Sequence, residues 1–267
     1  MKRRSSATIS RLVVNDTKPN AAWMSTQQWE QEARNWITWA RTPGHDVFSY
    51  YAPSFFEEIV PAAQGLTLEI GCGEGRVARQ LASRAHNVVA SDSSSTLVRA
   101  AREADGQSVY LVADATALPF AKATFQTVVA YNSLQTMAMM ADMAHAVREA
   151  GRVLMASGHF CICVAHPMTD VGRIKEPSAR GDLVISGSYF EHQRINETVT
   201  KDGLEMTFHG WTYTLEDYVR ALEEAGFLIE RVREPVPSAE QATTRPSLRV
   251  WRRVPLLLFI RAIKRWR

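Results

Sequence analysis

The sequence predicts a doubly wound α/β domain, in which helices cover both faces of a mostly parallel sheet. Three observations predict it. Short apolar runs alternate with helical segments of roughly ten residues from position 66 onward. These runs are nearly continuous, which is typical of strands buried on both faces. The first run ends in a glycine-rich turn that leads into a helix, as expected at the start of a βαβ unit.

The N-terminal part is predicted to be helical after a flexible start. Residues 1–22 are polar and basic without periodicity, so we expect a flexible arm. A single domain over 23–267 is expected to follow, opening with a helical lid at 26–60. Two helices are expected there, separated by Pro43-Gly44, and the first carries a stripe of Trp29, Ala33, Trp36 and Ala40.

Strands and helices then alternate. We predict strands at 66–70, 87–91, 109–112, 127–131 and 158–165, with helices at 76–84, 94–104 and 140–151. Residues 167–211 break this rhythm and are predicted to be a cap insert that ends in a β-hairpin turning at Lys201-Asp202-Gly203. A helix opened by Thr214 and Asp217 then leads to a strand at 227–233, a connection at 235–247 and a last strand at 255–263.

The charge of the chain lies at its ends. The net charge is +3 over 267 residues, with +4 in 1–22 and +7 in 249–267, so residues 23–248 carry −8. An acidic body with basic ends does not form the basic face of a nucleic-acid-binding protein. No run approaches the ~20 apolar residues that a membrane span needs. Three cysteines without metal-site spacing indicate a reduced, cytoplasmic protein without a bound metal; monomer and homodimer stay open.

The turn after the first strand favours a cationic cofactor. Glu69-Ile70-Gly71-Cys72-Gly73-Glu74-Gly75 places an acid two residues before the first glycine. A dinucleotide loop would need its third glycine at position 76, which is Arg76. A carboxylate at the loop repels a pyrophosphate and attracts an ammonium or sulfonium group.

Two further acids follow the next two strands. Asp92, followed by Ser93, lies 23 residues after Glu69 and is placed to accept hydrogen bonds from ribose hydroxyls. Asp114-Ala115 follows the third strand and is placed to bind an adenine edge. Taken alone, either aspartate is equally typical of a helix or turn cap. The carboxyl ends of neighbouring strands meet at one sheet edge, and this favours one adenosine site over separate caps.

These motifs resemble those of class I S-adenosylmethionine-dependent methyltransferases, and most of all the small-molecule group related to quinone-biosynthesis enzymes. The resemblance rests on Glu69–Gly75, Asp92, Val112–Ala115 with Leu118-Pro119-Phe120, and Val128–Leu134. It implies seven strands in the order 3-2-1-4-5-7-6 with strand 7 antiparallel. It further implies Glu69, Gly71, Cys72, Gly73 and Gly75 near the methionine part, Asp92 and Ser93 at the ribose, Asp114 and Ala115 at the adenine, and Tyr131 and Asn132 beside the methionyl group.

Histidines are the candidate general bases, should the acceptor need one. His166 ends the fifth strand and His209 lies in the hairpin. The alternative for His166 is a histidine hydrogen-bonded to backbone at a strand end. Arg41 and His45, in the lid, are candidates for the carboxylate of the methionine part, and the alternative there is a lid that packs through its tryptophans.

The sequence thus predicts transfer of a methyl group from S-adenosylmethionine to an O, N or C atom of a small molecule, in secondary or quinone-like metabolism, with S-adenosylhomocysteine as product. An NAD(P)-dependent oxidoreductase and a non-catalytic S-adenosylmethionine-binding protein are the alternatives. Apolar residues of the insert are expected to wall the acceptor pocket or to form the insert's own core: Tyr189, Phe190, Ile195, Met206, Phe208 and Trp211.

Overall fold

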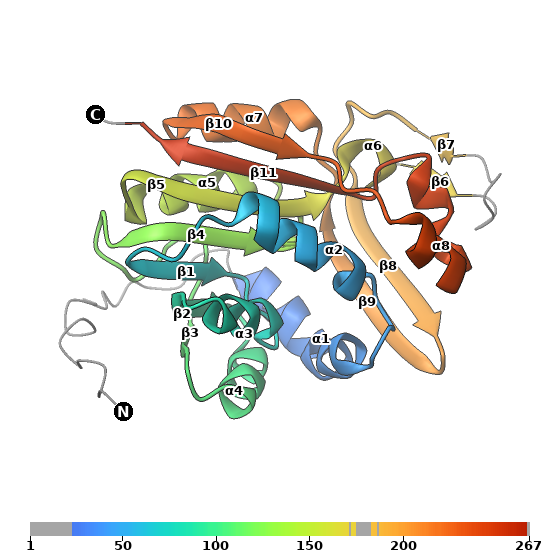
Figure 1. Ribbon diagram of the computed structural model, residues 1–267, viewed down its shortest axis with the longest axis horizontal. Helices are drawn as coiled ribbons and strands as arrows, with labels where there is room; N and C mark the ends of the chain where they lie inside the picture. Colours follow the sequence, from blue (N-terminus) through green and yellow to red (C-terminus); the bar gives the residue numbers. More distant parts are fainter. Residues whose placement is uncertain (1–22, 171, 175–182, 186, 266–267) are drawn as a thin grey trace.

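A seven-stranded sheet forms the centre of the molecule. The computed structural model describes residues 23–170, 172–174, 183–185 and 187–265. The sheet strands are β1 Leu66–Ile70, β2 Asn87–Asp92, β3 Val109–Val112, β4 Phe125–Tyr131, β5 Leu154–Ala165, β10 Phe227–Arg233 and β11 Leu257–Lys264. Their order is β10-β11-β5-β4-β1-β2-β3, and β11 is antiparallel to both neighbours (Figure 1). The predicted order and the antiparallel last strand are confirmed.

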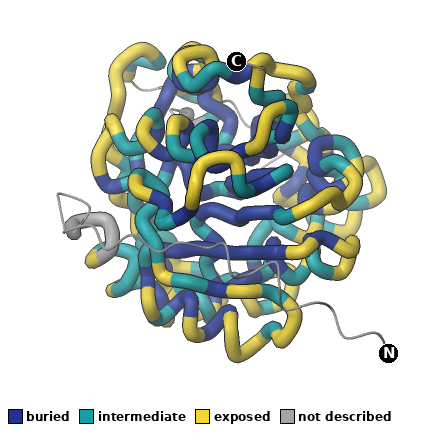
Figure 2. The backbone as a smooth tube through the Cα atoms, turned by 90° about the vertical axis from the view of Figure 1, so that its left-hand side faces the viewer, coloured by how far each residue is buried: buried dark blue, intermediate teal, exposed yellow. Residues whose placement is uncertain are grey.

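Helices cover both faces of this sheet. Successive side chains along each central strand point to opposite faces, and each face has its own apolar core. One face carries α2 Phe48–Ser54, a π-helical turn at Phe55–Ile59, α3 Arg76–Ser83 and α4 Ser95–Ala104, and the other carries α5 Asp142–Val153 and α7 Leu215–Glu224. On β4, Val128 packs into the core beneath α5 and α7, whereas Val129 packs into the opposite core. Buried residues follow the central strands in Figure 2. The doubly wound architecture is confirmed.

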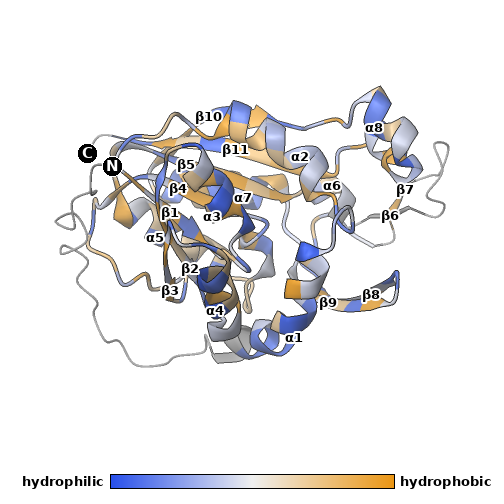
Figure 3. Ribbon diagram, turned by 60° about the horizontal axis from the view of Figure 1, so that its bottom comes forward, coloured by the Kyte–Doolittle hydropathy of each residue, from blue (hydrophilic) through white to orange (hydrophobic). Residues whose placement is uncertain are grey.

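An N-terminal helix and a β-hairpin stand together beyond the strand ends. Helix α1 spans Trp23–Arg41, and the hairpin consists of β8 Arg194–Lys201 and β9 Leu204–Trp211. The hairpin turns through Asp202 and Gly203, which both have positive φ, as a two-residue turn requires. Helix α1 packs along β9, and the two lie side by side in Figures 1 and 3. The predicted hairpin insert is confirmed.

The predicted connection over 235–247 contains a helix that the sequence did not indicate. Residues Ala239–Thr244 form helix α8. Ser238 accepts a hydrogen bond from the Gln241 backbone, and the Gln241 side chain accepts one from the Ser238 backbone. This capping box stabilises a helix start that the Pro and Ser content of the segment obscured. Two 3-10 turns, Pro246–Leu248 and Val250–Arg252, then lead into β11.

The cap insert also contains small elements that the sequence did not indicate. A short helix, α6, spans Pro167–Asp170, and β6 Gly172–Ile174 pairs antiparallel with β7 Leu183–Ile185. The expected flexible arm, residues 1–22, lies outside the described residues. Among the helices that are described, none has the length and apolar character to cross a bilayer.

The capping box at the start of helix α7 can be tested by substitution. Thr214 accepts a hydrogen bond from the Asp217 backbone at 3.1 Å, and Asp217 accepts one from the Thr214 backbone at 2.7 Å. Replacing Thr214 with alanine removes half of this capping box and should lower the free energy of unfolding by about 1 kcal/mol. The exposed Thr243 bonds only within helix α8, so Thr243→Ala should change it by less than about 0.5 kcal/mol. Urea denaturation measures both, and equal losses would contradict the capping role.

Candidate functional site

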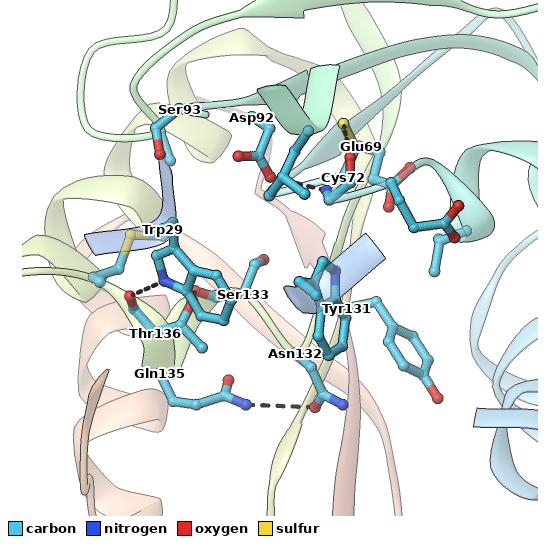
Figure 4. A pocket seen from close by; sticks show the side chains of 18 of the residues that line it. Trp29, Glu69, Cys72, Asp92, Ser93, Tyr131, Asn132, Ser133, Gln135 and Thr136 are labelled. Carbon is cyan, nitrogen blue, oxygen red and sulfur yellow. Dashed lines mark hydrogen bonds between the residues drawn. The ribbon is translucent and has the colours of Figure 1, made fainter. Parts of the chain in front are cut away.

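A cavity opens where the strand order reverses, at the carboxyl ends of β1 and β4. Its volume is about 290 Å³. The loops after β1, β2, β3 and β4 form its floor, and side chains of α1 and β9 form its roof. Helices of adjacent strands leave to opposite faces at this point, so the loops part and leave space for a ligand. Figure 4 shows ten of the lining residues labelled around this space.

The turn after β1 brings backbone rather than side chains to the cavity. The Gly71 and Cys72 amides donate to the Ser91 carbonyl at 2.8 and 2.9 Å, which ties the turn to β2. Gly71 has a φ of 70°, and a Cβ there would lie 2.4 Å from the Ser133 Cβ at the end of β4. Only glycine permits this approach of the two strand ends. Gly71, Cys72 and Gly73 line the cavity, and their contact with the methionine part stays a prediction.

Glu69 places a carboxyl group with one unpaired oxygen in this wall. Its exposed fraction is 2 %, and its Oε2 has no hydrogen-bond partner among the described residues. Burial raises the pKa of Glu69 well above its ordinary value, and the neighbouring Asp92 and Glu74 raise the pKa further. A cationic ligand group would bind favourably here. It would pair with the buried carboxyl oxygen and offset the repulsion between Glu69 and its acidic neighbours.

Asp92 is held at the end of β2 by two backbone donors. Its Oδ2 accepts from the Gly73 amide at 2.8 Å and its Oδ1 accepts from the Ser94 amide at 2.9 Å. Burial raises the pKa of Asp92, and these hydrogen bonds oppose that rise. The N-cap of α4 is Ser94, which accepts from the Leu97 amide at 3.1 Å. Asp92 is therefore not the N-cap of α4, but its Oδ1 accepts from the amide two residues further on, as in the turn-cap interpretation. Asp92 also lines the cavity.

The other residues predicted for the adenine and methionyl ends also meet here. Ser93, Asp114, Ala115, Tyr131 and Asn132 all line the cavity. Asp114 Oδ1 also accepts from the Thr116 amide at 2.8 Å, so this oxygen acts as the turn cap that the alternative interpretation expected. Asn132 follows β4 with a φ of 54°, and its backbone N–H donates to the Cys163 carbonyl at 2.7 Å.

Gly75 lies outside the described lining. It is the N-cap of α3, and a Cβ there would lie 2.9 Å from both the Ala101 Cβ and the Tyr110 hydroxyl. This glycine thus allows α3 to pack closely against α4 and β3. A direct role of Gly75 beside the methionine part stays a prediction.

Arg41 and His45 both have partners within the protein. Arg41 donates to Glu74 at 2.9 Å and to the Ala100 carbonyl at 2.9 Å, so it fastens α1 to the glycine turn and α4. His45 is buried against Trp39, with ring centroids 4.2 Å apart. Neither side chain lines the cavity as described, and the predicted contact with a ligand carboxylate is not tested.

The two candidate histidines also stand back from the cavity. His166 Nδ1 accepts from the Met168 amide at 3.2 Å, and its Nε2 lies 2.8 Å from Glu234 Oε1. Both nitrogens are thereby occupied, which matches the strand-end alternative. His209 neighbours Phe208 on β9; successive strand residues face opposite sides, and Phe208 faces the cavity. The catalytic roles of both histidines stay predictions.

The roof contains aromatic residues that the sequence placed in the lid or the insert without a named contact to the cofactor. Trp29 and Trp36 of α1 line the cavity, as does Phe208 of β9, which the sequence offered as a pocket wall. Their rings meet edge to face, with centroids 6.3 Å apart for Trp29–Trp36 and 6.5 Å for Trp36–Phe208. In the sequence, the two tryptophans lie on one helical stripe. This pattern is equally typical of residues that cover a cavity and of residues that pack into a core.

Arg76 and Glu30 were also missed. Arg76 is the cationic side chain in the described lining; its guanidinium lies 4.2 Å from the Phe48 ring centroid and is paired with Asp46. Glu30 on α1 accepts from the Ser94 hydroxyl at 2.6 Å and from the Thr96 amide at 3.2 Å, so it fixes α1 at the start of α4. Burial raises the pKa of Glu30, but the hydrogen bonds from Ser94, Thr96 and Ser95 outweigh it and lower the pKa overall.

The comparisons with known proteins agree with this geometry. Residues 68–162 match a family described as "Methyltransferase domain", and this range runs from β1 into β5. This stretch of the chain is therefore similar to a methyltransferase domain. No curated protein matches the chain.

Solved structures share the fold. An S-adenosylmethionine-dependent methyltransferase from Mesorhizobium loti is 23 % identical with a TM-score of 0.65, covering 80 % of this chain and 98 % of that one. One from Methanosarcina mazei is 19 % identical with a TM-score of 0.54, covering 77 % and 96 %. The [4+2]-cyclase SpnF is 16 % identical with a TM-score of 0.61, covering 94 % and 99 %.

A glycine series tests the close approach at the β1 turn. Gly71→Ala adds a methyl group against Ser133 at positive φ, and should lower the free energy of unfolding by about 2 kcal/mol or more. Gly203 also has positive φ but has open space around it, so Gly203→Ala should cost about 1 kcal/mol. Gly106→Ala, without either feature, should be nearly neutral. Thermal unfolding of the three variants measures the order, and a Gly71→Ala protein as stable as Gly106→Ala would contradict the structure.

Proposed function

We propose that the protein transfers a methyl group from S-adenosylmethionine to an O, N or C atom of a small aromatic or amphipathic molecule, as in secondary or quinone-like metabolism. The observation that carries the proposal is the buried Glu69 carboxyl group, with its unpaired Oε2, beside the glycine-rich turn. The residues fit this cofactor: Glu69 suits its ammonium group, and Asp92 suits the ribose hydroxyls. A pyrophosphate would meet the carboxyl groups of Glu69 and Asp92 at close range, which disfavours a nicotinamide dinucleotide.

The roof over the cavity supports a small acceptor. S-adenosylmethionine supplies an electrophilic methyl group on a sulfonium, so the protein's task is to bind, align and exclude water. Trp29, Trp36 and Phe208 cover the cavity with apolar surface and leave room for a compact molecule rather than a polymer. The three cysteines are buried and free, which is compatible with a reducing, cytoplasmic setting.

The described lining favours an acceptor that is already nucleophilic. It contains no histidine or lysine, and burial raises the pKa of Tyr131, which keeps that phenol protonated at neutral pH. A neutral amine, or a hydroxyl or carbon acid that ionises readily, needs no strong base in contact with it. In this proposal a hydroxyl or carbon acid loses its proton to solvent before it binds, whereas an amine loses its proton after the methyl group has been transferred.

A second candidate function is favoured by one comparison. SpnF shares the fold over nearly the whole length of both chains and is described as a [4+2]-cyclase. The cavity of our chain could in the same way serve a reaction other than methyl transfer, or cofactor binding alone. This alternative predicts binding of S-adenosylmethionine without release of S-adenosylhomocysteine when acceptors are supplied.

Calorimetry on the full-length protein tests the main proposal. S-adenosylmethionine and S-adenosylhomocysteine should bind with dissociation constants on the order of micromolar, and NAD should not bind. Methylated product and S-adenosylhomocysteine should then appear together when a panel of phenols and aromatic amines is supplied. Binding of NAD with no binding of either sulfur nucleoside would overturn the proposal.

The role of Glu69 predicts a pH dependence with a definite sign. The pKa of the free Glu69 carboxyl is raised, and a bound ammonium group favours its ionised form, so binding should release protons. Affinity for S-adenosylhomocysteine should therefore rise as pH increases from about 5.5 to 7.5. Glu69→Gln should weaken binding about 10- to 100-fold and reduce this pH dependence.

The exposed Glu57 provides the matched control for that measurement. Glu57→Gln makes the same chemical change away from the cavity, and its affinity and pH dependence should equal those of the parent protein. Titrations in two buffers of different ionisation enthalpy count the protons released. Proton uptake, or an unchanged pH profile in Glu69→Gln, would show that Glu69 does not meet the cation.

A further inference from the structure

Gln135 presents a buried hydrogen-bond acceptor that no group of the protein satisfies. It lies in the 3-10 turn Leu134–Thr136 after β4, and its exposed fraction is 8 %. Its Oε1 has no partner among the described residues, and the side chain lines the cavity. Leaving a buried carbonyl oxygen unpaired costs free energy, so such an atom in a cavity wall indicates a group supplied by a ligand.

The orientation of this amide is fixed by a short chain of hydrogen bonds. The Cys163 thiol donates to Asn132 Oδ1 at 3.6 Å, and burial raises the pKa of Cys163, which keeps that thiol protonated and able to donate. Asn132 Oδ1 also accepts from Gln135 Nε2 at 3.4 Å (Figure 4). The nitrogen of Gln135 is thus directed to Asn132, and its oxygen is left for the cavity.

The backbone around Gln135 is held on two sides. Gly210 of β9 lies so close that a Cβ there would be 2.2 Å from the Gln135 carbonyl oxygen. The indole of Trp29 donates to the Thr136 carbonyl at 3.2 Å. Both contacts come from the roof, so the roof and Gln135 are parts of one wall. The turn cannot withdraw Gln135 from the cavity without breaking them.

The surroundings of Oε1 define what the ligand must be. Trp29, Met137 and Phe208 provide apolar and aromatic surface in the same cavity. Glu69 and Asp92 lie at the ends of β1 and β2 and line another part of the cavity. In the proposed function they receive the ammonium group and the ribose of the cofactor. A flat apolar molecule carrying one O–H or N–H donor would fill the aromatic surface and satisfy the free oxygen.

We propose that Gln135 is a specificity-determining residue of the acceptor subsite, accepting a hydrogen bond from a hydroxyl or N–H group of an aromatic acceptor. This inference rests on the proposed function and names the class of its substrate. A site built to accept such a hydrogen bond discriminates against an analogue without the donor, because that analogue leaves the buried oxygen unpaired. Gln135 does not take the proton; it orients the acceptor against the aromatic roof.

A matched pair of probes tests the inference on the full-length protein. 2-Naphthol carries the donor, and 2-methoxynaphthalene has the same ring system without it. With S-adenosylhomocysteine at saturation, the parent protein should bind 2-naphthol roughly tenfold or more tightly than the ether, as measured by fluorescence titration. Gln135→Leu, of similar size, should bring this ratio to about one and leave the affinity for S-adenosylhomocysteine within about twofold.

Gln107→Leu provides the control, because Gln107 is exposed and outside the cavity; it should keep the parent ratio. The titrations are repeated without the nucleoside, so a failure of cofactor binding, which overturns the proposed function, is recognised separately. A parent protein that binds neither probe, or both equally, overturns the role of Gln135. So does a Gln135→Leu variant that keeps the ratio, or one that loses nucleoside affinity tenfold, since Gln135 would then serve the cofactor.

Discussion

The contact between Gly71 and Ser133 determines how this molecule forms a cavity. The turn after β1 passes so close to the end of β4 that a Cβ on Gly71 would lie 2.4 Å from that of Ser133. The Ser133 hydroxyl then donates to the Ile70 carbonyl at 2.8 Å and joins the two strand ends. Because these ends meet without intervening side chains, Glu69 on one strand and Asn132 after the other reach the same space. The polar floor of the site follows from this approach.

The electrostatics of the floor and the apolar character of the roof have separate origins. Strand ends in the sheet supply the carboxylates of Glu69 and Asp92, whereas the aromatic rings come from α1 and β9, which are far apart in sequence. Glu30 and Arg41 attach α1 to α4 and to the glycine turn. The Arg41 contact uses Glu74, a residue of that turn, so the roof is fixed to the floor through the glycine turn itself.

Much of the fold and of the floor could be predicted from the sequence because their signals are local. The bounds of β1, β3, β9 and β10 follow from apolar runs and turn residues, and Glu69, Gly71, Gly73 and Asp92 are recognised by their spacing. The roof and Gln135 could not be found in this way. The unpaired oxygen of Gln135 depends on Asn132, which follows β4, and on Cys163 of β5. The pairing of His166 with Glu234 spans 68 residues. Such contacts have no local pattern.

Ser94 gives the two ends of the cavity a shared residue. Its amide donates to Asp92, and its hydroxyl donates to Glu30 on the helix that carries Trp29 and Trp36. Ser94 therefore holds the end of β2 and the helix that carries both tryptophans at a fixed spacing, and this spacing sets the height of the cavity between them.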